Sequence, residues 1–332
     1  MRDSKEEGEM KIKLKFFLKF ALVIVLALCI LFPISILYQR GDTYNGTYAG
    51  IKKFEDVPQE IEFANFGPSY GMNCFDYAKL DEQGKTCFNF ALTMQDLYHD
   101  YEIYKKYQDN FKEGAVVAIT VSYFSFCSDN DAASSARYYK ILDSDSIKGY
   151  TLENDISAKF LPVYGKGNAL IRDITNDMLN EIMSNSVESN EVEEGNKALE
   201  LENDSKVRVL TIENGNLKPY GKYVEENEDL LVNWIKEMKD NGLNPVLVLT
   251  PYWENYANGF DKELLKNNYS DPISRVVEKT DVPYVNFNLP EYQEYTTTPE
   301  YFNNCDHVSK KGGVAFMELF VEYLKTTSIY KF

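Results

Sequence analysis

The chain has 332 residues, of which 44% are hydrophobic and 14% aromatic, which is enough for one large core or two small domains. Its 52 acidic side chains outnumber its 35 basic ones, and the formal net charge is −17. Nucleic-acid phosphates require a basic face, and this composition provides none, so we expect no nucleic-acid partner.

The N-terminal segment carries the clearest pattern. Residues 20–38 are uncharged and about long enough to cross a bilayer as a helix. Four lysines within residues 11–19 precede this stretch, whereas Arg40 is the only nearby positive charge after it. The positive-inside tendency therefore predicts a cytoplasmic segment 1–19, a single transmembrane anchor and an extracytoplasmic remainder. A cleaved signal peptide is the alternative, although the apolar run is longer than a usual signal core and no small-x-small site follows it.

Residues 39–59 are polar and are expected to form a stalk. Beyond them, apolar runs typical of buried strands alternate with amphipathic segments typical of helices. The strand candidates are 61–66, 87–92, 115–126, 244–253 and 282–288, and the helix candidates are 94–111, 228–242 and 309–327. Strands separated by helices predict one α/β domain over 60–332, with a parallel sheet between two helical layers.

The alternation stops between about residues 128 and 225. Segments 136–142 and 171–185 have helical patterns, whereas 186–206 is acidic and polar and is expected to be a solvated loop. We interpret the whole region as a helical and irregular insertion over one edge of the sheet. It is either a lid or a surface excursion without a role.

Cysteine use fits an exported chain. Cys29 lies inside the apolar span, which leaves Cys74, Cys87, Cys127 and Cys305. In an oxidising compartment we expect at least one disulfide among these four, either Cys74–Cys87 or Cys127–Cys305. The chain has no C-x-x-C pair and only two histidines, so no structural zinc or other metal is expected.

Ser69 stands directly after the first predicted strand, between Gly67 and Gly71 in "ANFGPSYG". A nucleophilic serine needs a tight turn that raises its hydroxyl, with backbone N–H groups nearby to receive an oxyanion. Flanking glycines permit such a turn. The alternative is an ordinary strand-to-helix turn in which Ser69 caps the helix.

His307 lies in "YFNNCDHVSKKGG", just before the last predicted helix. A lone histidine is usually a surface or capping residue. In a parallel sheet, however, a serine after the first strand and a histidine before the last helix both lie at the carboxyl edge. The other histidine, His99, falls in a predicted helix among aromatic residues, and we expect it at the surface or its boundary.

This order of motifs resembles the SGNH, or GDSL-like, hydrolase superfamily. It is most similar to the membrane-anchored envelope branch that includes the D-alanine transfer proteins of teichoic-acid D-alanylation and polysaccharide O-acetyltransferases. The family's Gly-x-Ser block is matched by Gly67-Pro68-Ser69, and its Asp-x-x-His block by Asn304-Cys305-Asp306-His307. The resemblance covers about 60–128 and 228–327 and implies an SGNH-like three-layer fold.

The chain departs from the family at several signature positions. Asn304 stands where the family has aspartate, and the block-two glycine and block-three asparagine have no counterpart in 87–93 or 122–126. Either Asn304 or the adjacent Asp306 could orient His307. The expected oxyanion donors are the Ser69 backbone N–H and a side chain from Asn89, Ser122 or Ser125. Tyr70 and Tyr252 are expected to line the substrate pocket. Tyr252 could instead be a core residue.

The resemblance implies a membrane-anchored extracytoplasmic esterase or acyltransferase that acts on acyl esters of a cell-envelope glycan or lipid-linked polymer. Ser69 would be the nucleophile and His307 the general base, and no cofactor would be needed. A transferase would also need an acyl donor from across the membrane, which implies a multi-spanning acyltransferase partner. The alternative is a catalytically degraded SGNH-like envelope protein with a binding or scaffolding role, which the departures favour.

Overall fold

The structure is a computed structural model that describes residues 2–40, 50–127, 137–160, 194–215, 223–327 and 329–330. The chain forms two compact units. One comprises residues 1–49 with 150–187, and the other comprises residues 50–149 with 188–332.

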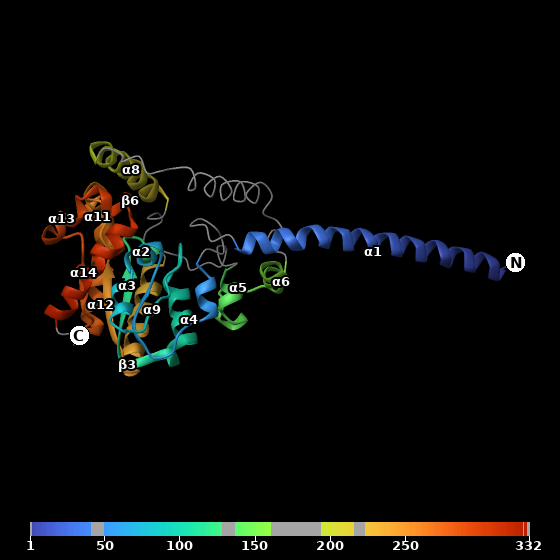
Figure 1. Ribbon diagram of the computed structural model, residues 1–332, viewed down its shortest axis with the longest axis horizontal. Helices are drawn as coiled ribbons and strands as arrows, with labels where there is room; N and C mark the ends of the chain where they lie inside the picture. Colours follow the sequence, from blue (N-terminus) through green and yellow to red (C-terminus); the bar gives the residue numbers. More distant parts are fainter. Residues whose placement is uncertain are drawn as a thin grey trace. The chain divides into compact units, whose positions relative to one another are not determined.

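The first unit contains the long helix α1, Arg2–Arg40, drawn in blue in Figure 1. Its stretch Ile12–Ile36 is apolar, is mostly exposed and is long enough to cross a membrane. The predicted anchor 20–38 therefore falls mainly within this stretch. A membrane anchor and a signal sequence share these features. The unit also contains α6, Leu152–Phe160, which belongs to the predicted insertion.

The second unit is built on a five-stranded sheet with the strand order β2-β1-β3-β4-β5. All neighbouring pairs are parallel, which confirms the predicted parallel sheet. The strands are β1 Ile61–Phe66, β2 Cys87–Asn89, β3 Phe111–Val121, β4 Asn244–Leu249 and β5 Tyr284–Asn286. A separate antiparallel pair is formed by β6 Phe302–Asn304 and β7 His307–Val308.

Helices cover both faces of this sheet. The longer ones are α4 Leu97–Tyr107, α9 Val224–Asp240, α12 Asp271–Thr280 and α14 Lys310–Thr326, and α2 Ser69–Cys74 follows β1 directly. Helix α9 contacts both α4 and α12, whereas α14 contacts α2. On β1, the Phe66 ring packs edge-on against Trp234 of α9, while the amide of Asn65 binds the Gly71 carbonyl of α2. Adjacent strand residues point to opposite faces, so the two helical groups form separate layers and the predicted three-layer α/β architecture is confirmed.

Shorter helices complete this unit. They are α3 Ala78–Glu82, α5 Tyr138–Ile141, α10 Glu254–Ala257, α11 Lys262–Leu265 and α13 Gln293–Thr296. Several of them lie in loops that follow the carboxyl ends of strands. The candidate site residues predicted from the sequence lie in the same loops.

The central strands end earlier than the apolar runs suggested. Strand β3 stops at Val121 rather than at 126, and β4 stops at Leu249 rather than at 253. After β3 the chain turns where the Ser122 N–H donates to Ser125 Oγ at 2.8 Å. Aromatic residues in these loops are buried, so composition alone could not distinguish the strand from the loop that follows it.

The predicted stalk is wrong for its second half. Residues Lys52–Glu55 form the 3-10 helix η1, and the Phe54 ring contacts Phe88, Phe90 and Tyr107 of the domain. Apolar burial of one aromatic residue therefore attaches this segment to the second unit. The first part of the stalk, residues 41–49, lies outside the described residues.

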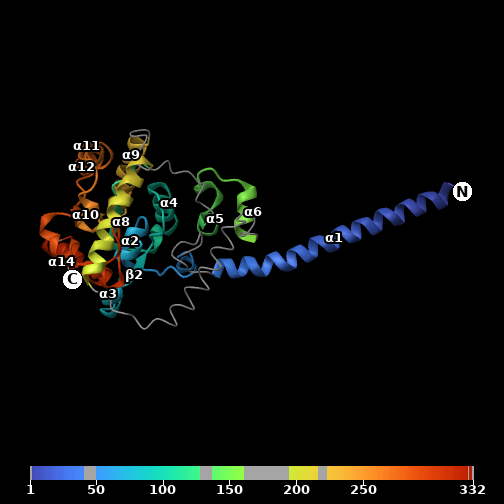
Figure 2. The same ribbon diagram turned by 90° about the horizontal axis from the view of Figure 1, so that it is seen from above.

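The predicted loop 186–206 is also wrong from Glu194 onward, because helix α8 spans Glu194–Asn214. The α8 side chains Leu201, Ser205, Val209 and Ile212 recur every three or four residues and are buried. Acidic residues between these positions made the segment look like a solvated loop. Helix α8 packs on α10 and on the 3-10 turn η8, Pro299–Tyr301, and Figure 2 shows it beside α10. The helical pattern predicted at 171–185 lies outside the described residues.

The predicted disulfide is absent, because Cys74, Cys87, Cys127 and Cys305 are all free thiols. Each faces a different neighbour. The Cys127 thiol donates to Asn268 Oδ1 at 3.4 Å, whereas burial next to Asp306 and Asp204 raises the pKa of Cys305. Proximity to strand ends in the sequence did not bring any two of these thiols together.

Candidate active site

The turn after β1 is shaped by Gly67. Its φ of +129° is a conformation that only glycine adopts readily, and a Cβ there would lie 2.6 Å from the Thr120 Cβ of β3. The Gly67 N–H donates to Asp100 Oδ1 of α4 at 2.9 Å. The turn is thereby held against both the sheet and a neighbouring helix, and Ser69 becomes the first residue of α2.

Gly71 packs equally closely, since a Cβ there would lie 2.6 Å from Thr120 Oγ1. Its carbonyl accepts hydrogen bonds from the amides of Asn65 at 3.2 Å and Asn89 at 3.3 Å. The Asn89 amide also donates to the carbonyls of Met72 and Phe75. Asn89 therefore stabilises α2, and the structure corrects its predicted role as an oxyanion donor, because its amide nitrogen is already engaged.

The structure brings Ser69 and His307 together. The distance between Ser69 Oγ and His307 Nε2 is 2.7 Å, and both side chains are largely buried. His307 begins β7, and Ser309 then caps α14 by accepting the Gly312 N–H at 3.1 Å. The histidine is therefore fixed between a short hairpin and a capped helix, at the end of the sheet where Ser69 lies.

Both residues proposed to orient His307 contact it. The Nδ1 atom lies 2.7 Å from Asp306 Oδ1 and 3.0 Å from Asn304 Oδ1. Asn304 Oδ1 also accepts the Asp306 backbone N–H at 3.2 Å, which ties the two residues into one turn. Asp306 makes the shorter contact and is the one that can carry a negative charge.

The second carboxylate oxygen of Asp306 is also bound. Its Oδ2 accepts the Tyr70 hydroxyl at 3.3 Å and the Arg208 Nε–H at 3.0 Å. Burial of Asp306 acts to raise its pKa, but the hydrogen bond to His307 and the charges of His307 and Arg208 outweigh burial and lower that pKa below its ordinary value. The carboxyl group is therefore ionised at neutral pH.

Tyr70 and Tyr252 form an aromatic wall beside the imidazole. The Tyr70 ring stacks on His307 with centroids 4.9 Å apart, and Tyr252 packs edge-on against Tyr70 at 5.4 Å. Burial raises the pKa of both phenols well above the ordinary value, so both are neutral. The burial of Tyr252 agrees with the alternative that it is a core residue, while Tyr70 contacts two members of the site directly.

Ser122 and Ser125 bond to each other rather than to Ser69. Their hydroxyl oxygens are 3.0 Å apart, and Ser125 Oγ also accepts the Ser122 N–H. They stabilise the turn that follows β3. Their predicted part in an oxyanion hole is therefore not supported by a contact within the described part of the chain.

The other histidine is not at the surface. His99 is fully buried, its Nδ1 lies 2.9 Å from both carboxylate oxygens of Asp96, and its ring stacks on Tyr138 at 3.8 Å. The predicted surface or boundary position is therefore wrong. An aspartate one helical turn earlier offered the ring a polar partner inside the core.

Two contacts that support the site were not predicted from the sequence. Asp100 holds the Gly67 backbone, and Arg208 holds Asp306. Asp100 falls in a helix whose pattern predicted only packing, and Arg208 falls in the insertion, close to a stretch that was expected to be loop. Neither carries a local motif, because each acts across the fold on a residue far away in the sequence.

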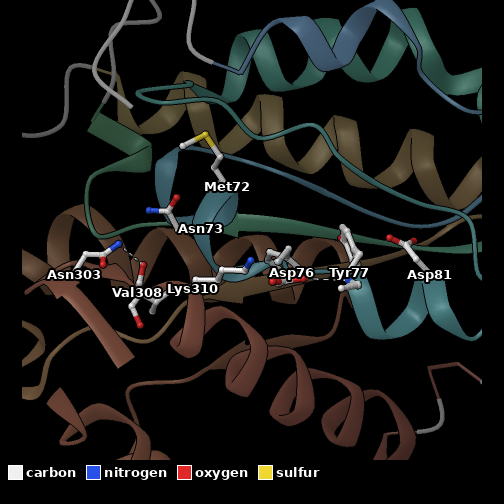
Figure 3. Close-up of a pocket in the computed structure, with 11 residues that line it drawn as sticks. Met72, Asn73, Asp76, Tyr77, Asp81, Asn303, Val308 and Lys310 are labelled. Atoms are coloured by element: carbon white, nitrogen blue, oxygen red, sulfur yellow. Dashed lines mark hydrogen bonds between the residues drawn. The ribbon is translucent and has the colours of Figure 1, made fainter. Parts of the chain in front are cut away.

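A pocket of about 530 Å³ is lined by residues within 72–81 and 303–310, two segments that adjoin Ser69 and His307 along the chain. One wall is formed by the α2–α3 segment, including Met72, Asn73 and Tyr77, and the other includes Asn303 and Val308. In Figure 3 a row of side chains runs across the view, with Met72 and Asn73 above it; the row comprises Asn303, Val308, Lys310, Asp76, Tyr77 and Asp81. Met72 lies one helical turn after Ser69, and Val308 follows His307, so both walls extend from elements that carry the site.

No group of three or more histidine, cysteine or acidic side chains that could hold a metal is found among the described residues. No family model matches the sequence, and a comparison with curated proteins gives no match.

The chain is similar in fold to several solved structures. A GDSL-like lipase from Bacteroides thetaiotaomicron matches with 8% identity and a TM-score of 0.37, over 84% of this chain and 98% of that one. A Bacteroides fragilis protein described as an acylhydrolase gives 8% identity and a TM-score of 0.40, over 84% and 95%. An acetyl xylan esterase gives 10% identity and a TM-score of 0.37, over 78% and 98%. These TM-scores lie below 0.5, so the likeness assigns neither an activity nor a substrate to this chain.

Proposed function

We propose that this chain is a serine esterase of the SGNH type, in which Ser69 attacks the carbonyl of an acyl ester and His307 transfers the proton. The observation that supports this function is the continuous hydrogen-bonded path from Ser69 Oγ through both ring nitrogens of His307 to the carboxylate of Asp306. Serine, histidine and an acid in this order are the parts of a nucleophilic triad, which is recognised by geometry rather than by sequence position.

The path defines the direction of proton transfer. Both groups facing His307 Nδ1, Asp306 Oδ1 and Asn304 Oδ1, are acceptors, so Nδ1 carries the proton and Nε2 can accept one from Ser69. As Ser69 Oγ bonds to the acyl carbon, its proton moves to Nε2. The ionised Asp306 stabilises the imidazolium that forms, and His307 then returns the proton to the departing alcohol. Water releases the acyl group by the same route in reverse.

Backbone N–H groups are the best oxyanion donors in this site. Helix α2 begins at Ser69, and its N-cap residue, Pro68, makes no side-chain cap. The first N–H groups of a helix have no partner within it, so those of Ser69 and Tyr70 are suited to bind a developing oxyanion. This arrangement would replace the donors that the family's missing glycine and asparagine would otherwise supply.

The cavity lined by α2–α3 and by Asn303–Lys310 is proposed to bind the alcohol part of the ester. Its carboxylates, amides and Tyr77 suit a hydroxyl-rich molecule such as a glycan. We further propose that α1 anchors the chain in the cell membrane with the domain outside, so that the substrate is an acylated envelope glycan or lipid-linked polymer. A multi-spanning acyltransferase would be the partner if the acyl group is transferred rather than hydrolysed.

A non-catalytic envelope protein is the second candidate. It is favoured by the engagement of Asn89 with α2 and by the mutual pairing of Ser122 and Ser125, which leave no predicted side-chain oxyanion donor near Ser69 within the described residues. The alternative would use the same cavity for binding alone.

Ester hydrolysis separates these candidates. Full-length protein in detergent would be assayed with p-nitrophenyl acetate, comparing wild type, Ser69→Ala and Ser274→Ala. Ser274 lies on α12 and its exposed hydroxyl donates to the Ser270 carbonyl, so this variant is a matched control. We expect Ser69→Ala to lower kcat by roughly 10⁴-fold or more and Ser274→Ala to leave it unchanged. A folded Ser69→Ala protein with wild-type turnover would contradict the proposal.

A further inference from the structure

Helix α8 of the insertion is bound to the loop that carries the triad acid. Three polar contacts, all at 3.0 Å, join them over four consecutive loop residues. The contacts are Lys197 Nζ to the Asn303 carbonyl, the Cys305 N–H to Asp204 Oδ2, and Arg208 Nε to Asp306 Oδ2. They lie on residues spaced along one side of the helix.

The same helix is held at its other end. Glu213 Oε1 accepts the Asp261 N–H at 2.7 Å, and Val209 packs close to Gly259. Residues 259–261 belong to the loop region that follows β4. Helix α8 therefore connects the loops after β4 and before β7, and its position fixes the backbone around Asp306.

Arg208 is the member of this set that acts on a side chain of the site. The Asp306 side chain is completely buried, whereas 43% of the Arg208 side chain is exposed, so the guanidinium reaches the carboxylate from the solvent side. One oxygen of Asp306 binds His307 and the other binds Arg208 and Tyr70. A carboxylate held at both oxygens keeps one orientation, just as outer partners orient the ligands of metal sites.

We propose that Arg208 is a positioning residue that fixes the Asp306 carboxylate so that Asp306, rather than Asn304, orients His307. The inference rests on the proposed esterase function. Without the guanidinium, Asp306 keeps only the weaker Tyr70 hydroxyl on Oδ2 and is free to rotate. Asn304, 3.0 Å from Nδ1, then becomes the main partner of the ring, and it carries no charge to stabilise an imidazolium.

The surroundings of Asp306 leave this task to Arg208. Asp306 interacts electrostatically with His307 and Arg208. It also interacts with four buried titratable groups, those of Tyr70, Tyr252, Tyr256 and Cys305. Burial raises the pKa of each of these four groups, so all four are neutral at neutral pH. Among the described groups around Asp306, Arg208 is therefore the permanent positive charge.

Kinetics of three α8 variants test the proposal. Arg208→Gln should lower kcat for p-nitrophenyl acetate by roughly 10- to 100-fold with KM near wild type, as expected for losing a hydrogen bond to a charged group. Arg208→Lys should recover most of the rate. Lys206→Ala, which removes only a surface pair with Glu202, should behave as wild type.

A spectroscopic readout keeps the test independent of turnover. The chain contains only two histidines, so ¹⁵N-histidine labelling of the full-length protein gives signals from His99 and His307 alone. We expect a strongly downfield Nδ1 proton for His307, displaced upfield in Arg208→Gln and retained in Arg208→Lys and Lys206→Ala. The His99 signal is an internal reference, since that ring binds Asp96, the N-cap residue of α4.

Two results would overturn the inference. The first is an Arg208→Gln protein with wild-type kcat and an unmoved His307 signal. The second is a rate loss that appears entirely in KM with that signal unmoved, which would make Arg208 a substrate-binding residue. If wild type itself fails to hydrolyse esters, the esterase proposal fails, and the His307 signal alone still decides whether Arg208 positions the Asp306–His307 pair.

Discussion

The turn that carries Ser69 and the loop that carries His307 are stabilised in different ways. The Ser69 turn is determined by backbone geometry, because Gly67 adopts φ +129° and a Cβ on either flanking glycine would clash with Thr120 of the central strand. The His307 loop is instead held by side chains from distant segments, including Asp204 and Arg208 of α8. Substitutions in the insertion should therefore leave the position of Ser69 unchanged, whereas they should disturb the positions of Asp306 and His307.

The largest expected effect concerns the two residues that face His307 Nδ1. Asp306→Asn removes the negative charge that supports the imidazolium, and the equivalent change in trypsin lowers kcat by about 10⁴-fold. Asn304→Ala leaves the 2.7 Å contact of Asp306 in place and should cost roughly tenfold or less. The measurement is kcat/KM for p-nitrophenyl acetate, with folding checked by circular dichroism.

Asn304→Asp sharpens this comparison. It places a second carboxylate next to Asp306, so repulsion between like charges should offset any gain from restoring the family's acid. An increase in turnover above wild type, together with little loss in Asp306→Asn, would show that position 304 orients the ring.

Gly67→Ala should test the local character of the Ser69 turn. The added Cβ meets Thr120 Cβ at 2.6 Å and the backbone conformation becomes strained, so we expect a loss of roughly 3 kcal/mol in the free energy of unfolding. Gly84→Ala is the matched control, because Gly84 has φ +75° but nothing within 4 Å of the new Cβ. Its loss should be about 1 kcal/mol, from strain alone. Equal losses in urea denaturation would show that contact with Thr120 does not constrain the turn.

The smallest effect is expected from reduction. Cys74, Cys87, Cys127 and Cys305 are free and face different neighbours, so dithiothreitol should leave the melting temperature unchanged. Thiol titration of the unfolded, non-reduced protein should detect all five cysteines. Detection of three or fewer thiols would reveal a disulfide bridge and would contradict this prediction.

The contrast between these regions also explains which parts could be predicted from the sequence. The parallel sheet follows from buried runs such as 244–249, and Ser69 follows from its glycines, because both signals are local. The order of Ser69 and His307 along the chain was enough to place them at one edge of the sheet. The orienting residue stayed open because Asn304 and Asp306 are neighbours, and only the folded loop shows that both reach Nδ1.

The remainder depended on contacts between distant segments. Helix α8 was hidden by its acidic outer face, and Arg208 has no motif that links it to a carboxylate 98 residues away. The burial of His99 against Tyr138 likewise depends on packing that no periodicity within α4 reveals. Disulfide pairing failed for the same reason, because closeness to strand ends along the sequence does not determine which way a thiol points.

The proposed mechanism requires that His307 activates Ser69 as a nucleophile. The most direct test is to label full-length protein with a fluorophosphonate and map the adduct by mass spectrometry, comparing wild type with His307→Gln. We expect one adduct, on Ser69, formed at least about 10³-fold more slowly when His307 is replaced. An adduct on another residue, or labelling of Ser69 at the same rate without His307, would contradict it.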